Sequence, residues 1–294
     1  MVNEKKLEIF VQGKGKQTIV IEPGMFCPLD DWMDIIDELS LYSNVITFHR
    51  PGYGQSELGD KPKTTENVSL ILNELLEVLG INHPIVLVGH SYGGLCAQNF
   101  VKMYPEKVAG LVLVDSTSVN LHKLDELVLP ISDEINSDEH WIQKCEKYSK
   151  MSKNNLQKEL HPSLTPKQLR LPINSQKHLL EFPVNPNTYK AMALEIQNWK
   201  QCALHIKNKG VFPNVPLKII GRDPQYSIKQ AFGEGIPYDE AKQLETIWQQ
   251  LIQEQTTLSR QSELIIAKDA GHSIHVDRPD IVIDAIKNLL YLIV

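Results

Sequence analysis

One short stretch limits what this chain can fold into more than any other: residues 89–93, which read Gly-His-Ser-Tyr-Gly. Residues 85–88 before it are all apolar, which predicts a strand buried on both faces. Residues 95–103 after it have the spacing of a helix. The glycines permit a turn so tight that Ser91 must adopt strained backbone angles. Such a turn lifts the Ser91 hydroxyl above the sheet edge, beside the amides that open the helix, and is typical of a nucleophilic serine.

The rest of the chain alternates between strand and helix patterns up to residue 118 and again after residue 210. Strands are expected at residues 7–12, 18–22, 44–48, 85–88, 107–115, 216–220 and 262–267, and helices at 30–41, 65–79, 95–103, 238–258 and 280–291. Because strands that alternate with helices form parallel sheets, the pattern predicts an α/β fold with a mostly parallel, twisted sheet and helices on both faces.

Residues 119–210 break this rhythm, since they are polar and prone to form helices and contain no buried-strand run. An insertion after a sheet strand lies over the carboxyl edge of the sheet, where open α/β sheets bind ligands. We therefore expect a core domain of residues 1–118 and 211–294 and a helical cap of residues 119–210, inserted after the sixth strand.

Composition excludes several classes of function. With 294 residues the chain suits one large α/β domain that carries an insertion. A net charge of −6 and a pI near 5.9 argue against nucleic acid or an anionic membrane as the main partner. Neither an apolar leader nor an apolar run of membrane-spanning length stands out in the sequence, so a cytoplasmic location is expected.

Metal and cofactor motifs are also missing from the sequence. The 4 cysteines show no C-x-x-C spacing, and there is no H-E-x-x-H motif or carboxylate-rich loop. We therefore expect no metal and no cofactor. The sequence carries no signal for an oligomeric state.

The loop after residues 18–22 supplies a second part of the candidate site. That strand should lie beside the strand leading to Ser91, and it ends in Pro23-Gly24-Met25-Phe26. A loop in this position can donate a backbone amide to a developing oxyanion, in addition to the amide of Tyr92. The donor would be the amide of Met25 or Phe26, although the loop can also be a plain β-turn.

Taken together, these motifs resemble the α/β-hydrolase superfamily over nearly the whole chain. The stretches that carry the resemblance are Glu22-Pro-Gly, His49-Arg-Pro-Gly-Tyr-Gly-Gln-Ser, Gly89-His-Ser-Tyr-Gly-Gly, Leu111-Val-Leu-Val-Asp-Ser, and Ala270-Gly-His before Asp277-Arg-Pro. The family often carries His-Gly in the oxyanion loop, where this chain has Pro23-Gly24, so the identity of the amide donor stays open. The resemblance implies the α/β-hydrolase fold and a triad in the chain order serine, acid, histidine.

His272 is the base that this order implies. It follows the last expected strand in a Gly-His loop, and acyl transfer needs a group that takes the Ser91 proton and later returns it to the leaving group. His275 is the local rival, and His90 belongs to the turn itself.

Two aspartates compete for the role of the acid. The usual family position is the loop after residue 220, where Asp223 lies one residue earlier than the family spacing from Gly221. Asp115, which follows the preceding strand, occupies the location that some family members use. We favour Asp115 and keep Asp223 as the alternative.

The resemblance implies a serine hydrolase without a cofactor. We expect a small carboxylic ester as substrate and a carboxylesterase-like activity, with related acyl compounds within reach because the cap and pocket set the chemistry. Some proteins that resemble this family act instead as ligand receptors or stress-signalling proteins with little or no turnover. An epoxide-opening enzyme usually needs an aspartate where Ser91 stands.

Overall fold

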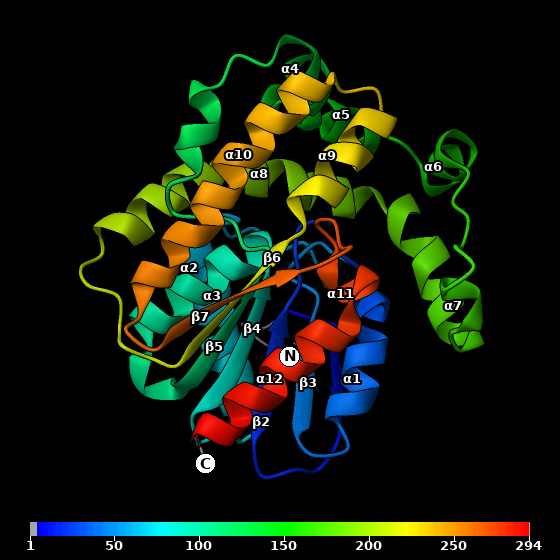
Figure 1. The fold of residues 1–294 in the computed structure, drawn as a ribbon. Coiled ribbons are helices and arrows are strands. Elements are labelled where there is room, and N and C mark those ends of the chain that lie inside the picture. Colours follow the sequence, from blue (N-terminus) through cyan, green and yellow to red (C-terminus); the bar gives the residue numbers. More distant parts are fainter. Residues whose placement is uncertain (1–4, 294) are drawn as a thin grey trace.

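A computed structural model describes residues 5–293, which form a sheet of 7 strands with helices on both faces (Figure 1). The strands are β1 (Ile9–Gln12), β2 (Thr18–Glu22), β3 (Asn44–Phe48), β4 (Ile85–His90), β5 (Val108–Val114), β6 (Leu217–Arg222) and β7 (Ser262–Ala267). Their order in the sheet is β1-β3-β2-β4-β5-β6-β7. Among the described strands only the β1–β3 pair is antiparallel, so the expected mostly parallel α/β fold is confirmed.

Helices cover the two faces of the sheet because the central strands are apolar on both sides. The covering helices are α1 (Met33–Leu39), α2 (Thr65–Val78), α3 (Tyr92–Met103) and α12 (Pro279–Ile293). In β4, Ile85 and Leu87 pack with α2 and α3, whereas Val86 and Val88 pack with α1 and α12. This alternation fixes the register of β4, since a slip of one residue would exchange the two faces.

The segment between β5 and β6 is helical and lies over the carboxyl edge of the sheet (Figure 1). It contains α4 (Pro130–Asn136), α5 (Asp138–Ser149), α6 (Lys153–Leu160), α7 (Ile173–Glu181) and α8 (Pro186–Asn208). The sequence predicts this helical insertion after a sixth strand, and that prediction is wrong. In the structure the insertion follows the fifth strand, β5, because each of the five apolar runs before residue 119 forms a single strand.

Two helices that follow β6, α9 (Pro224–Gly233) and α10 (Tyr238–Glu254), reach up beside this cap (Figure 1). The Glu240 carboxylate on α10 accepts hydrogen bonds from the amides of Ile131 and Ser132 in α4, which ties the cap to the core. The remaining elements are the helix α11 (Ile274–Asp277) and the 3-10 turns η1 (Leu29–Trp32), η2 (Pro105–Lys107), η3 (Leu121–Glu126), η4 (Gln168–Arg170), η5 (Phe182–Val184) and η6 (Gln255–Leu258). No helix within residues 5–293 has both the length and the apolar character needed to cross a membrane.

Candidate active site

Ser91 occupies the strained turn between β4 and α3. Its φ of 53° and ψ of −124° are unusual for a residue with a side chain, and such angles persist only where the surroundings impose them. The Ser91 amide donates to the Val114 carbonyl at 3.2 Å, and its own carbonyl accepts from the Thr117 amide at 3.0 Å. A Cβ at Gly93 would lie 2.1 Å from the Glu22 carbonyl oxygen, so this position requires glycine. Strand β5 and the end of β2 therefore lock the turn.

Asp115 and His272, which are 157 positions apart, meet at the same edge of the sheet. Nδ1 of His272 lies 2.6 Å from Oδ2 of Asp115, and the Asp115 side chain is fully buried while that of His272 is 41% exposed. Trp248 on α10 donates its Nε1–H to the other oxygen of Asp115 at 2.9 Å. Burial opposes ionisation of Asp115, but the Arg222 guanidinium and the hydrogen bond with His272 outweigh it and lower the pKa of this carboxyl. Asp115 is thus a buried anion that orients the His272 ring through Nδ1.

Asp223 caps a helix instead. Its Oδ1 accepts from the amides of Gln225 and Tyr226 at 2.9 and 3.2 Å, which begins α9. Its Oδ2 accepts from the amide of Asp269 at 3.1 Å. These amides lower the pKa of Asp223, the Asp269 amide contributing most. Among the described residues, no hydrogen bond or ion pair joins Asp223 to His272.

The two other histidines near the turn are buried. His275 is 2% exposed and its ring stacks on Trp32, with 4.3 Å between the ring centroids. Nε2 of His90 lies 3.0 Å from the backbone oxygen of His272 and so holds the loop that carries it. His275 is therefore buried in the packing beneath the turn, whereas the ring of His272 reaches the surface.

The loop of residues 23–26, which the sequence predicts to be the oxyanion loop, passes directly beside Ser91. A Cβ at Gly24 would lie 3.1 Å from the Ser91 Cβ. Register brings the loop there, because Glu22 at the end of β2 pairs with Gly89 in β4. Phe26 in this loop has a φ of 52°, in the left-handed region.

Arg50 fixes the loop from behind. Its guanidinium donates to the carbonyl oxygens of Pro23 and Gly24. It also forms a two-bond pair with Glu195 of the cap helix α8, at 2.7 and 3.0 Å. Tyr53 donates to the same carboxylate at 2.7 Å, and all of these side chains are buried. Burial opposes the charge of Arg50, but the Glu195 carboxylate raises its pKa well above the ordinary value.

Sequence reasoning missed this link between cap and loop. A signal exists, however, because Glu195 lies at helical spacing on the buried face of α8 with Thr188 and Ala191. A carboxylate on a buried helix face requires a partner. The partner itself, Arg50, is 145 positions away, so the pairing could not be read from spacing.

Glu22 gives this network a testable dependence on pH. Burial raises the pKa of its carboxyl to about 8, Arg50 opposing and Glu195 adding to the rise. The unfolded chain ionises near 4.5, so the stability that Glu22 contributes is fully present below that pH and is lost as the pH rises towards 8. The expected slope approaches about 1.4 kcal/mol per pH unit. Glu22→Gln should remove it, so that the free energy of unfolding of the variant rises relative to wild type between pH 5 and pH 8, measured by urea unfolding. Glu106→Gln at an exposed site is the control, and a Glu22→Gln difference that is constant with pH would contradict the assignment.

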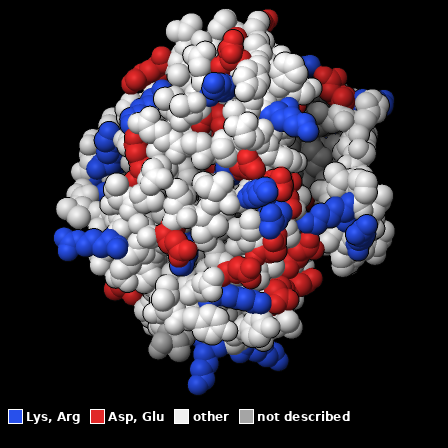
Figure 2. All heavy atoms as spheres, in the orientation of Figure 1, with Lys and Arg blue, Asp and Glu red and all other residues white. Residues whose placement is uncertain are grey.

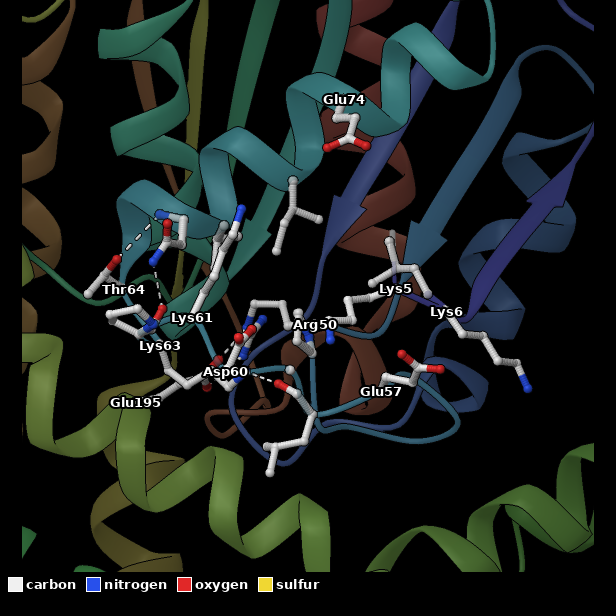
Figure 3. Close-up of a pocket in the computed structure, with 18 residues that line it drawn as sticks. Lys5, Lys6, Arg50, Glu57, Asp60, Lys61, Lys63, Thr64, Glu74 and Glu195 are labelled. Carbon is white, nitrogen blue, oxygen red and sulfur yellow. Dashed lines mark hydrogen bonds and ion pairs between the residues drawn. The ribbon is translucent and has the colours of Figure 1, made fainter. Parts of the chain in front are cut away.

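A cavity of about 520 Å³ adjoins the Arg50–Glu195 pair and lies beside α2 (Figure 3). Its lining carries both signs of charge, from Lys5, Lys6, Lys61, Lys63, Glu57, Asp60 and Glu74. Neither Ser91 nor His272 lines it, and its mixed charges indicate no single class of ligand.

The loop of His272 lies against α9, since a Cβ at Gly271 would be 3.5 Å from the ring of Tyr226. Figure 2 shows a recess on this face between α9 and the α6–α7 pair, on a surface where acidic and basic side chains are interspersed.

The parallel sheet, the strained serine turn and the aspartate–histidine pair define an α/β protein with a cluster of polar side chains at the carboxyl edge of its sheet. The chain belongs to the alpha/beta hydrolase fold family, whose model matches residues 17–164, about half of its length. The family inferred from the sequence motifs is thereby confirmed.

Known proteins extend the likeness over the full chain. The uncharacterized protein YqjL of Bacillus subtilis is 22% identical over 271 residues, which cover 92% of this chain and 82% of that protein. A thermophilic esterase from Thermogutta terrifontis superposes with a TM-score of 0.62 at 20% identity, covering 98% of this chain and 94% of that one. The epoxide hydrolase CorEH superposes with a TM-score of 0.72 at 16% identity, covering 100% and 98%. At these identities the two structures establish the fold alone.

Proposed function

We propose that this protein is a serine hydrolase that cleaves a small carboxylic ester through an acyl-enzyme on Ser91. The observation that carries the proposal is the 2.6 Å contact between His272 and the buried Asp115, at the sheet edge where the strained turn presents Ser91. A buried carboxylate that accepts a hydrogen bond from one imidazole nitrogen leaves the other nitrogen free to take a proton from a nucleophile. Membership of the hydrolase-fold family and the fold shared with an esterase agree with this activity.

Each residue then has a defined role. His272 takes the proton of Ser91 through Nε2 as the serine oxygen attacks the ester carbonyl, and Asp115 holds Nδ1–H and stabilises the imidazolium. The imidazolium returns the proton to the leaving alcohol, and water releases the acyl group by the same route. Among the residues that the structure describes, no hydrogen bond joins Ser91 to His272; such bonds often tighten only when substrate binds.

The amide of Tyr92 and that of Met25 or Phe26 are the proposed oxyanion donors. Tyr92 opens α3, where the helix N-terminus favours negative charge. Either Met25 or Phe26 can supply the second amide, because both follow Gly24 in the loop beside Ser91. Arg50 supports the loop by binding its carbonyl oxygens, and the recess beside α9 is the proposed route for substrate.

Turnover of p-nitrophenyl esters of increasing acyl length tests the proposal, with fluorophosphonate labelling followed by peptide mass analysis. The proposal expects turnover that is fastest for short acyl chains, and a label on Ser91. Labelling of Ser91 without turnover of any ester would instead favour a ligand receptor or signalling protein of this fold. Absence of a label would mean that the serine turn is structural.

A further inference from the structure

Three side chains from distant parts of the sequence converge beneath the serine turn. Cys27 follows the oxyanion loop, His90 ends β4 and His275 lies in α11. One nitrogen or sulfur atom from each lies within 4.8 Å of the others, and Cys27 Sγ is 3.6 Å from His275 Nε2. The three residues are 9%, 4% and 2% exposed, respectively.

The tautomer of His90 leaves a lone pair without a partner. A backbone carbonyl can only accept, so the contact between His90 Nε2 and the His272 oxygen places the ring proton on Nε2. Nδ1 is then unprotonated, and within residues 5–293 it finds no hydrogen-bond partner. Buried polar atoms are normally paired, so this one requires an explanation. An imidazole that donates one N–H to a carbonyl and leaves the other nitrogen uncovered has the form of a metal ligand.

We propose that Cys27, His90 and His275 form a binding site for one thiophilic cation of the Zn²⁺ type. Zinc bonds of about 2.3 Å to sulfur and about 2.0 Å to nitrogen place tetrahedral ligand atoms roughly 3.5 Å apart. The Cys27–His275 separation of 3.6 Å already matches this. The His90 ligand atom lies within 4.8 Å of the other two, so an approach of at most about 1.3 Å completes the set. A thiol with two imidazoles selects zinc or copper(I) over magnesium or calcium.

The stacked indole of Trp32 fixes the ring plane of one ligand, His275, with 4.3 Å between the ring centroids. Burial raises the pKa of the Cys27 thiol to about 12, so the sulfur keeps its proton until a cation displaces it. Binding displaces the thiol proton to solvent, so one anionic ligand faces the doubly charged ion, and the Asp31 carboxylate lies near enough to add negative charge.

Cobalt(II) titration of the full-length protein, first stripped with a chelator, tests the site. We expect one Co²⁺ per chain with a thiolate-to-cobalt charge-transfer band in the near ultraviolet, displaced by one equivalent of Zn²⁺. Cys27→Ser should abolish the band, and His275→Gln should weaken binding at least 100-fold. Cys145→Ser, at a buried thiol outside the cluster, is the matched control and should bind as wild type does.

Two further variants separate this inference from others. Ser91→Ala should still bind one Co²⁺, because the site does not depend on the proposed hydrolysis. Circular dichroism establishes that Cys27→Ser is folded; if it is not, Cys27→Ala replaces it, and the wild-type band alone reports the thiolate. Absence of binding at micromolar metal, or equal binding by folded Cys27→Ser, would overturn the proposal.

Discussion

Replacing Ser91 with alanine is expected to lower kcat for p-nitrophenyl esters by about 10⁶-fold, the loss seen when a triad serine is removed. The reason is structural as well as chemical. The turn holds one hydroxyl above the sheet edge, and the Val114 and Thr117 backbone contacts give the chain no freedom to present another. The remaining activity would come from the oxyanion amides and substrate binding alone. Initial rates across the ester series measure the loss, and fluorophosphonate labelling should vanish with it.

Ser273→Ala is the matched control for this variant. Ser273 is an exposed serine next to His272, and its side chain makes no capping hydrogen bond. The same chemical change there should alter kcat no more than a few-fold. If Ser91→Ala retained a tenth of wild-type turnover, the nucleophile would lie elsewhere and the proposed acyl-enzyme would be excluded.

Short-range patterns are what made the fold predictable. The run at residues 85–88, the glycines around Ser91 and the helical spacing after it act within about a dozen residues, and their strand, turn and helix lie where expected. Parallel pairing then follows from the alternation of strands and helices. The register that sets Glu22 beside Gly89, and so brings the loop of residues 23–26 to the turn, depends instead on how the two faces of each strand pack.

Short-range patterns could not choose between the two aspartates proposed as the acid partner of His272. Asp115 and Asp223 both follow sheet strands, and their positions relative to those strands are too similar to favour either one. What distinguishes them comes from far away: Trp248, 133 positions from Asp115, donates to its carboxylate. Two of the amides that occupy Asp223 belong to a helix, α9, for which the sequence offered no apolar pattern. The third, that of Asp269, comes from the loop after β7, 46 positions away.

The same limit applies to every buried polar group in this region. Arg50 and Glu195, or Cys27 and His275, meet only because the cap and the last loop return to the same sheet edge. Such pairs cannot be predicted from spacing in the sequence, since no fixed number of residues separates the partners. Their burial is informative once the structure is known, because a buried charge or lone pair without a partner is costly.

Asp115→Asn is expected to lower kcat by about 10⁴-fold with little change in KM, as when a triad aspartate becomes an amide. Asparagine can present an N–H to His272 Nδ1, which favours the wrong tautomer and removes the charge that stabilises the imidazolium. Arg222 keeps Glu245 as a second partner at 2.6 Å, so the variant should remain folded, as urea unfolding can establish.

Asp223→Asn makes the identical change at the competing position and should cost only a few-fold. Asparagine caps helices as well as aspartate does, so α9 should still begin at residue 224. Both variants lose one negative charge near the carboxyl edge of the sheet, but only the carboxylate of Asp115 contacts His272. Comparing their kcat values therefore decides between the two aspartates. A 10⁴-fold loss in Asp223→Asn with an active Asp115→Asn would reverse the assignment, and it would require the His272 loop to move onto the cap of α9 when substrate binds.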